Sequence, residues 1–171
     1  SLLEMKTTMS EKVQKFENLF AKYLGVKHAI MVNSGSSANL LAMSILSNSS
    51  LSKAKIKKSD EIITPAVTWA TTVYPILNIG ATPVFVDVGL KDYTIDPEKI
   101  EKAITKKTKA IFLVHLLGNP CNMTEIKKIA NKHNLLIIED ACEAHGAEFK
   151  NKKVGSFGNL ATFSFFASHH I

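Results

Sequence analysis

The sequence predicts an α/β fold in which helices cover both faces of a mostly parallel sheet. Short apolar runs of strand length recur along the chain, and segments with apolar residues at helical spacing separate them. Strands that alternate with helices are typical of parallel sheets, because each connection must cross one face of the sheet. Strands are expected at residues 29–32, 61–64, 83–88, 109–114, 135–138 and 161–165.

Capping residues mark the ends of the predicted helices. Thr8 and Glu11 have the spacing of a capping box, and Gly25 follows the last apolar residue of that first helix. A later helix has Pro97 at its first position, behind Asp96 as its cap. The remaining helix signals are the polar turn at 33–38, Thr68 with Gly80 at the far end, and Thr124.

Composition limits the class of protein. The chain has 171 residues, 46% of them hydrophobic and 21% charged, which is typical of one soluble globular domain. No apolar run approaches the roughly 20 residues of a membrane span, so we expect no membrane partner. Cys121 and Cys142 are too few for a disulfide framework and lack metal-ligand spacing. We therefore expect a cytoplasmic protein with reduced thiols and no bound metal.

The net charge of +6 does not by itself predict a nucleic-acid partner. All 21 basic residues are lysines, and the densest run lies at residues 53–58. That run contains no aromatic residue for stacking and no arginine for bidentate contacts. We interpret the lysines as a solvated surface and expect no nucleic acid to bind.

Polar residues collect after the predicted strands. Ligands of parallel sheets bind beyond the carboxyl ends of the strands. The turn at 33–38, between a predicted strand and a helix, has the composition of an anion site, while an ordinary serine-capped helix explains the same residues equally well. The polar residues expected on this one edge are 34–37, Trp69, His115, Asp140, Glu143 and 164–169.

Seven segments in order carry a resemblance to a known family. From about residue 11 to the end, the chain resembles the DegT/DnrJ/EryC1/StrS sugar aminotransferases, which are fold-type-I enzymes dependent on pyridoxal phosphate. Seven ordered matches are a specific signal, where one alone is weak. The resemblance implies that residues 1–171 are part of a three-layer α/β/α large domain, without the C-terminal small domain. The segments are 33–38, 60–65, 86–87, 114–115, 139–141, 144–147 and 164–166.

The resemblance also assigns roles on this edge. Trp69 matches the aromatic position that stacks on the pyridine ring of the cofactor, with a core tryptophan as the structural alternative. Asp140 matches the carboxylate that pairs with the pyridine nitrogen and keeps the ring able to accept electrons, with a helix or turn cap as its alternative. The ligands of the cofactor phosphate match four small residues, Gly35, Ser36, Ser37 and Ser164.

Two departures from the aminotransferases favour another reaction. His169 stands five residues after Ser164, where the aminotransferases carry the lysine that binds the cofactor covalently. Imidazole transfers protons near neutral pH but cannot form that bond. Glu143 stands where many members carry glutamine. Both residues, with the loop at 116–120, resemble the 3-dehydratase branch, so we expect His169 and Glu143 to be catalytic.

The implied reaction is loss of the hydroxyl at carbon 3 of a nucleotide-linked 4-keto-6-deoxyhexose, in deoxysugar and lipopolysaccharide biosynthesis. The implied cofactor is pyridoxamine 5′-phosphate or pyridoxal 5′-phosphate, held without a covalent bond, and His169 would remove a proton from it. Two alternatives stay open, an aminotransferase with its lysine beyond Ile171 and a catalytically inactive fragment. We expect a homo-oligomer, a dimer. The sequence leaves open whether an iron–sulfur reductase partner is needed, since cluster cysteines would lie elsewhere.

The chain stops on an apolar strand tip, so we expect a fragment of a longer protein. The resemblance implies an antiparallel strand, later in the chain, between the strands at 29–32 and 161–165. Without it these two strands would face a gap of two strand spacings, each ~4.8 Å. We expect another chain to fill the gap, the two strands to pair directly, or the first strand to detach.

Overall fold

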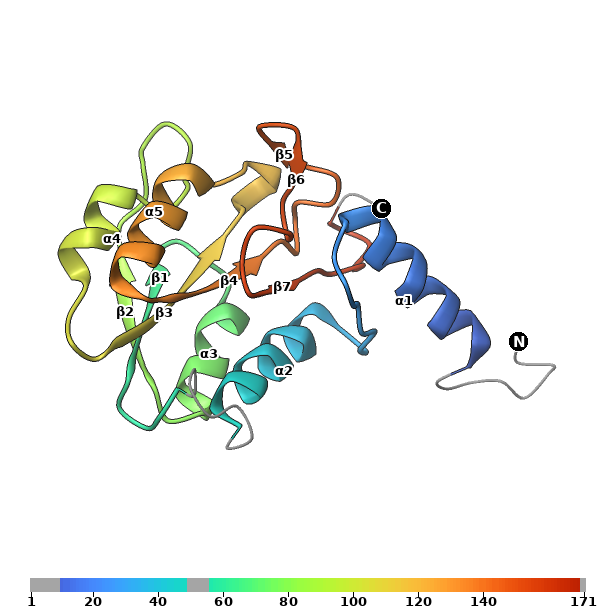
Figure 1. Ribbon diagram of the computed structural model, residues 1–171, viewed down its shortest axis with the longest axis horizontal. Coiled ribbons are helices and arrows are strands. Elements are labelled where there is room, and N and C mark those ends of the chain that lie inside the picture. Colours follow the sequence, from blue (N-terminus) through green and yellow to red (C-terminus); the bar gives the residue numbers. More distant parts are fainter. Residues whose placement is uncertain (1–9, 49–55, 170–171) are drawn as a thin grey trace. The chain divides into compact units, whose positions relative to one another are not determined.

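The computed structural model describes residues 10–48 and 56–169, and the chain divides into two units between Asn33 and Ser34. The second unit contains the sheet (Figure 1). Thr8 of the predicted capping box, residues 53–55 of the lysine run and His170 lie outside the described residues. Within the described parts, no helix combines the length and apolarity that a membrane span requires.

The first unit contains helix α1, Glu11–Leu24, close to its predicted bounds. Ser10 is the residue at its N-cap. Gly25 ends the helix in the left-handed conformation, with φ 70°, and its N–H reaches the carbonyls of Ala21 and Lys22. A side chain is strained at that φ, which is why glycine predicts this helix end well.

The strand predicted at residues 29–32 is wrong. These residues belong to no strand, Ile30 is 66% exposed, and the N–H of Met31 donates to Glu17 Oε1 at 2.8 Å. A short apolar run fits a strand pattern, but it becomes a strand only where a neighbour offers hydrogen bonds. Among the described residues no antiparallel strand joins the main sheet either. Residues 29–32 therefore do not pair directly with β7 in the described chain, so direct pairing of the two strands is the expected outcome that the structure contradicts.

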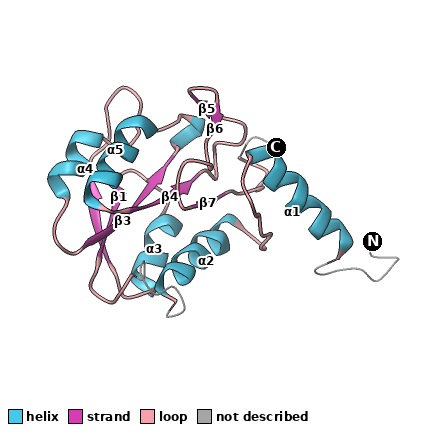
Figure 2. Ribbon diagram, viewed as in Figure 1, coloured by secondary structure: helices cyan, strands magenta, loops and turns pink. Residues whose placement is uncertain are grey.

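Five strands form the main sheet in the order β2-β1-β3-β4-β7, and every pairing is parallel (Figure 2). This arrangement confirms the predicted α/β class. Because all strands run in the same direction, their carboxyl ends form one edge. The strands are β1 Glu61–Pro65, β2 Thr82–Val86, β3 Thr108–Val114, β4 Leu136–Asp140 and β7 Leu160–Thr162.

Helices cover both faces of this sheet, and strand residues alternate between two cores. Ile111 packs with Ile126 on the face of α4 and α5, whereas the adjacent Phe112 packs with Met43 on the face of α2 and α3. The continuous apolar strands therefore have a direct cause, since both of their faces are buried. The helices are α2 Gly35–Ser47, α3 Ala70–Asn78, α4 Pro97–Ala103 and α5 Met123–His133.

The residue predicted to cap α5, Thr124, is wrong. Asn122 caps this helix in place of Thr124, because its side-chain oxygen accepts the N–H of Glu125 at 3.3 Å. Either polar residue fits the sequence signal, and only the backbone path decides which side chain faces the open N–H groups. The Asp96 cap is confirmed, with its carboxylate accepting the N–H of Glu98 at 2.9 Å.

The last strand is shorter than predicted. β7 pairs with β4 only from Ile138 opposite Leu160 to Asp140 opposite Thr162, because β4 itself ends at Asp140. Beyond that point the chain leaves the sheet, and Phe166 is 67% exposed. The apolar run after Thr162 is therefore not a buried strand, contrary to its hydrophobic pattern.

The connector between β4 and β7 contains a hairpin that the sequence did not reveal. β5 Glu148–Phe149 and β6 Lys152–Lys153 pair antiparallel. The turn residues Lys150 and Asn151 both have positive φ, 51° and 61°. Such turns match the twist of a hairpin, but lysine rarely adopts the left-handed conformation and strands of two residues show no periodicity.

Candidate active site

The carboxyl edge of the sheet brings together residues that are far apart in the sequence. α2 begins beside the end of β7, where a Cβ added to Gly35 would lie 2.7 Å from Ser164 Cβ and 3.1 Å from Cys142 Sγ. The first distance is shorter than carbon atoms allow, so only glycine fits without a shift. Two of the residues predicted to hold the phosphate, Gly35 and Ser164, are therefore in contact.

The first turn of α2 keeps the donors that an anion needs. Ser34 caps the helix, and its hydroxyl accepts the N–H of Ser37 at 3.1 Å. The turn contains no acidic residue, so the N–H groups of Gly35 and Ser36 stay at the positive end of the helix without a competing carboxylate. The serine-capped helix is therefore confirmed, and the anion site stays a prediction that this helix start is compatible with.

Asp140 is the last residue of β4 and is held by three donors. Its Oδ2 accepts from Asn39 Nδ2 and from Thr72 Oγ1, both at 2.9 Å, while its Oδ1 accepts the N–H of Cys142 at 3.2 Å. Asn39 is itself oriented by Thr162 Oγ1, which donates to Asn39 Oδ1 at 2.6 Å. Side chains from α2, α3 and β7 thus fix the direction of this carboxylate.

Asn39 and Thr72 were not predicted from the sequence. A signal for Asn39 existed, because it shares the buried face of α2 with Ala42 and Met43 at helical spacing. A polar side chain on an apolar stripe requires a buried partner, which here is Asp140. Thr72 carried no comparable signal, since threonine occurs on both faces of helices.

Trp69 is not a core residue. It is the N-cap residue of α3, in the loop that follows β1, and 74% of it is exposed. Its carbonyl accepts the N–H of Thr72, the residue that also donates to Asp140. A position in the core, the alternative considered for this tryptophan, is therefore excluded. Trp69 lies in the same turn as Thr72, whose hydroxyl donates to the Asp140 carboxylate.

Glu143 joins two loops at the carboxyl edge. Its Oε2 accepts the N–H of Leu117 at 2.9 Å, and Leu117 belongs to the short 3-10 helix η1, Leu116–Gly118, that follows β3. Leu117 has a φ of 53°, an uncommon value for a branched residue, and its side chain is exposed. The carboxylate thus stabilises a strained loop beside the candidate site.

His169 lies in the turn that follows Ser164. Its N–H donates to the carbonyl of Phe166 at 2.9 Å, and its ring meets the Phe166 ring edge-on at 5.7 Å. Its Nδ1 is buried and finds no hydrogen-bond partner among the described residues. No hydrogen bond joins His169 to Asp140 within the described residues.

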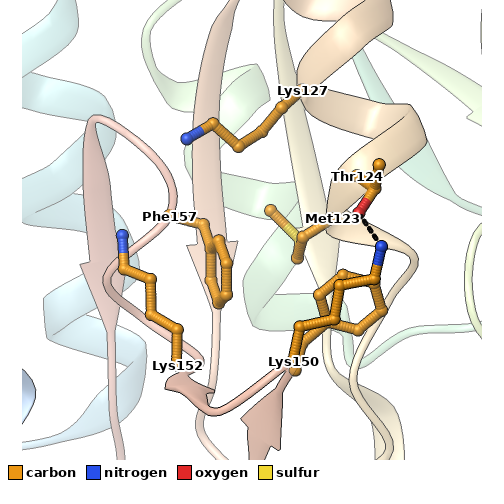
Figure 3. A pocket seen from close by; sticks show the side chains of 7 residues that line it. Met123, Thr124, Lys127, Lys150, Lys152 and Phe157 are labelled. Carbon is orange, nitrogen blue, oxygen red and sulfur yellow. Dashed lines mark hydrogen bonds between the residues drawn. The ribbon is translucent and has the colours of Figure 1, made fainter.

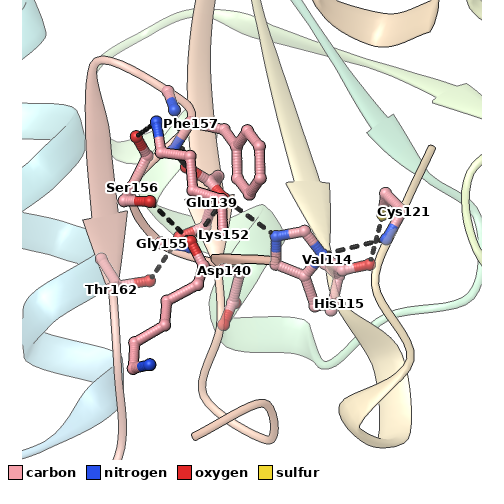
Figure 4. A network of polar contacts seen from close by, with 12 residues as sticks. Val114, His115, Cys121, Glu139, Asp140, Lys152, Gly155, Ser156, Phe157 and Thr162 are labelled. Atoms are coloured by element: carbon pink, nitrogen blue, oxygen red, sulfur yellow. Dashed lines mark hydrogen bonds and ion pairs between the residues drawn. The ribbon is translucent and has the colours of Figure 1, made fainter. Parts of the chain in front are cut away.

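His115 follows the last residue of β3, at the carboxyl edge as expected, but its side chain does not face a ligand site. Its side chain is fully buried, its Nδ1 accepts the N–H of Cys121 at 3.1 Å, and its Nε2 lies 3.0 Å from Glu139 Oε2 (Figure 4). Because Nδ1 accepts, the proton of the neutral ring is on Nε2, which donates to Glu139. His115 is therefore part of a structural network.

Glu139 is the centre of that network. Its two oxygens also accept the N–H groups of Gly155, Phe157 and Gly158 at 2.6–2.7 Å. Burial raises the pKa of the Glu139 carboxyl, but the hydrogen bond from His115 and those from the backbone outweigh burial, so the pKa lies below its usual value. The Glu139 carboxylate thus binds the segment after β6 to the end of β4. It lies one residue before Asp140.

Similar proteins combine this fold with nucleotide-sugar chemistry. The chain is 48% identical to a GDP-4-keto-6-deoxy-D-mannose 3-dehydratase of Escherichia coli over 172 aligned residues, which cover 100% of the chain and 44% of that protein. It is 44% identical to a GDP-perosamine synthase of Caulobacter vibrioides, covering 91% of the chain and 40% of that protein. The chain thus spans less than half the length of these relatives.

A solved structure matches as well. The E. coli 3-dehydratase with bound hydrated PLP superposes with a TM-score of 0.92 at 48% identity, over 99% of this chain and 43% of that one. The match covers the parallel sheet and the helices on both its faces. Residues 2–171 match the DegT/DnrJ/EryC1/StrS aminotransferase family, and the chain therefore belongs to it.

Proposed function

We propose that the protein carrying these residues is a 3-dehydratase of a nucleotide-linked 4-keto-6-deoxyhexose, with residues 1–171 as part of its cofactor-binding large domain. The observation that carries the proposal is His169, five residues after Ser164, at the position that the family resemblance gives to the covalent lysine. The similarity to 3-dehydratases over the whole chain supports it. The cofactor we propose is pyridoxamine or pyridoxal 5′-phosphate.

The residues at the carboxyl edge fit this cofactor. The α2 turn offers N–H groups and hydroxyls without an acidic neighbour, and the missing side chain of Gly35 lets the turn approach Ser164. Gly35, Ser36, Ser37 and Ser164 would hold the phosphate. Asp140, fixed by Asn39 and Thr72, would accept a hydrogen bond from the protonated pyridine nitrogen, and the exposed ring of Trp69 would cover the cofactor ring.

Bound there, the cofactor would supply an electron sink at the reacting carbon. The protein would supply the proton transfer. Imidazole can take up and return a proton near neutral pH, and the ring of His169 carries a nitrogen without a hydrogen-bond partner in the described chain. Glu143 would orient the loop at η1 and assist departure of the hydroxyl at carbon 3. The Asp140 carboxylate would hold the cofactor in position.

An aminotransferase is the second candidate. The similarity to a GDP-perosamine synthase supports it, because that relative is nearly as similar as the dehydratases. The two activities differ in what residue 169 does. A dehydratase needs only a base there, whereas a transaminase of this family needs the amine of a lysine.

Borohydride reduction separates the two candidates. The whole protein is incubated with pyridoxal phosphate, reduced and digested, and its peptides are weighed by mass spectrometry. We expect no adduct on the peptide that contains residue 169, and an adduct there after His169→Lys. Substrate incubation should release 3-deoxy product in the presence of pyridoxamine phosphate. A reduced adduct at another lysine with transamination of the sugar would refute the dehydratase assignment.

A further inference from the structure

A cavity lies between the start of α5 and the hairpin β5–β6 (Figure 3). Its volume is about 220 Å³, enough for a small organic molecule. None of the candidate active-site residues lines it. Its lining residues are Met123, Thr124, Lys127, Phe149, Lys150, Lys152 and Phe157.

The floor of this cavity is apolar. Met123 is fully buried beneath it, and the rings of Phe149 and Phe157 meet edge to face with centroids 6.1 Å apart. Both rings are only partly buried, although phenylalanine normally packs completely into a core. An aromatic floor that stays open to solvent is suited to a flat apolar group.

The rim is cationic. The ammonium of Lys152 lies 4.7 Å from the centroid of Phe157, and that of Lys150 lies 5.5 Å from the centroid of Phe149. Lys150 donates to Thr124 Oγ1 at 3.0 Å and Lys152 donates to the carbonyl of Ser156 at 2.8 Å. These neutral acceptors orient the two side chains without cancelling their charges.

The carboxylates near the cavity form ion pairs with lysines that do not line it. Glu125, on the first turn of α5, pairs with Lys128 at 3.8 Å, and Glu148, on β5, pairs with Lys153 at 2.9 Å. Among the described residues no carboxylate lines the cavity, so Lys127, Lys150 and Lys152 add three positive charges around it. Like charges gathered around one concave surface favour an anion between them.

We propose that this cavity binds a small organic anion, a phosphate or carboxylate that carries a flat apolar group. The anion would lie among the three ammonium groups, and the apolar group would rest on Phe149 and Phe157. This site is separate from the residues of the proposed dehydratase reaction and does not depend on that reaction. Whether or not the cavity binds an anion, the proposed function is unchanged.

Titration with phenyl phosphate, followed by amide NMR on this chain, tests the site. We expect saturable shifts at residues 149–157 and at the start of α5, with a dissociation constant of about 1 mM. Inorganic phosphate should bind more weakly because it lacks the ring, and phenol should bind more weakly because it lacks the charge. Raising the salt concentration should weaken phenyl phosphate binding, since the lysines are exposed to solvent.

Substitutions of the lining residues test which side chains bind phenyl phosphate. Lys127→Gln, Lys150→Gln and Lys152→Gln should each weaken binding by about three- to tenfold, and Phe157→Leu should remove the preference for phenyl phosphate over phosphate. Lys106→Gln, in the exposed turn before β3, is the matched control and should bind normally. Circular dichroism verifies that each variant is folded. Absence of saturable shifts, or wild-type affinity in the triple glutamine variant, would overturn the proposal.

Discussion

Glu139 and Asp140 are adjacent carboxylates that point to opposite faces of the sheet. Strand geometry sends successive side chains to opposite sides, so Asp140 meets Asn39 and Thr72 while Glu139 meets His115. Glu139 is saturated with donors and buried, which suits a structural role. Asp140 is held in one direction and stands beside the α2 turn, which suits a ligand-binding role.

Stability should depend on the Glu139 carboxylate. Its pKa is lower in the folded state than the usual value of about 4.3, so the ionised form stabilises the fold above that pH. This stabilisation is lost as the pH falls through the lower, folded-state pKa. Urea unfolding of Glu139→Gln at neutral pH should show a loss of about 2–4 kcal/mol, and a smaller decrease between about pH 5 and 3 than in the wild type.

Glu98→Gln is the control for this experiment, because Glu98 is exposed on the first turn of α4. Its free energy of unfolding should stay within about 0.5 kcal/mol of the wild type. An equal pH dependence in wild type and Glu139→Gln would refute the proposed role of the Glu139 carboxylate.

His169 should matter for rate more than for binding. In the whole protein, His169→Asn should lower turnover by about 10²–10⁴-fold while the affinity for pyridoxamine phosphate changes only a few-fold. Steady-state kinetics and a fluorescence titration of the cofactor measure the two quantities. Ser168→Ala, at an exposed neighbour, is the control. Normal turnover of His169→Asn would mean that another group moves the proton.

At the scale of elements, the first turn of α2 depends on what it packs against. Helix α2 is capped by Ser34 and starts with Gly35, whose missing side chain admits Ser164 and Cys142. The turn and the segment after β7 are therefore one structural unit, although well over a hundred residues separate them in sequence. The phosphate cradle we propose exists only when both are in place.

Gly35→Ala should separate the first turn of α2 from the segment that follows β7. The added methyl group would overlap Ser164 Cβ, so we expect a loss of about 1–3 kcal/mol in stability and a clear loss of cofactor affinity. Thermal unfolding and a pyridoxal phosphate titration of the whole protein measure the two effects. Gly25→Ala is the contrasting variant, because a Cβ there meets nothing within 4 Å. It should cost about 1 kcal/mol through its left-handed backbone and leave cofactor affinity unchanged.

At the scale of the whole molecule, burial governs the thiols. Burial raises the pKa of Cys121 to about 12, and burial together with the Asp140 charge also raises the pKa of Cys142. Cys121 Sγ in addition donates to the carbonyl of Val114 at 3.1 Å. Both sulfurs are kept as thiols by the packed sheet and the loops at its edge, and not by their local sequence.

The folded chain should therefore react slowly with a disulfide reagent at about pH 8, a pH near the ordinary thiol pKa of about 8.5. Addition of urea should release both thiols to fast reaction in the same transition that circular dichroism reports. Fast modification of either cysteine in the native protein would show that the fold does not protect that thiol.

Much of the fold was predictable because its signals are local. The caps at Asp96 and Gly25 and the apolar runs of β1, β3 and β4 depend on neighbours in sequence, so the α/β class and the parallel sheet followed from them. The site residues named from the sequence depend on the rule for strand ends and on the family resemblance, and their roles stay predictions. What only the tertiary structure decided was pairing. Residues 29–32 have a strand pattern but pair with no strand of the described chain, β7 stops where β4 stops, and the side chain of His115 is buried against Glu139. Hydrogen-bond partners across the fold are non-local, and no sequence window contains them.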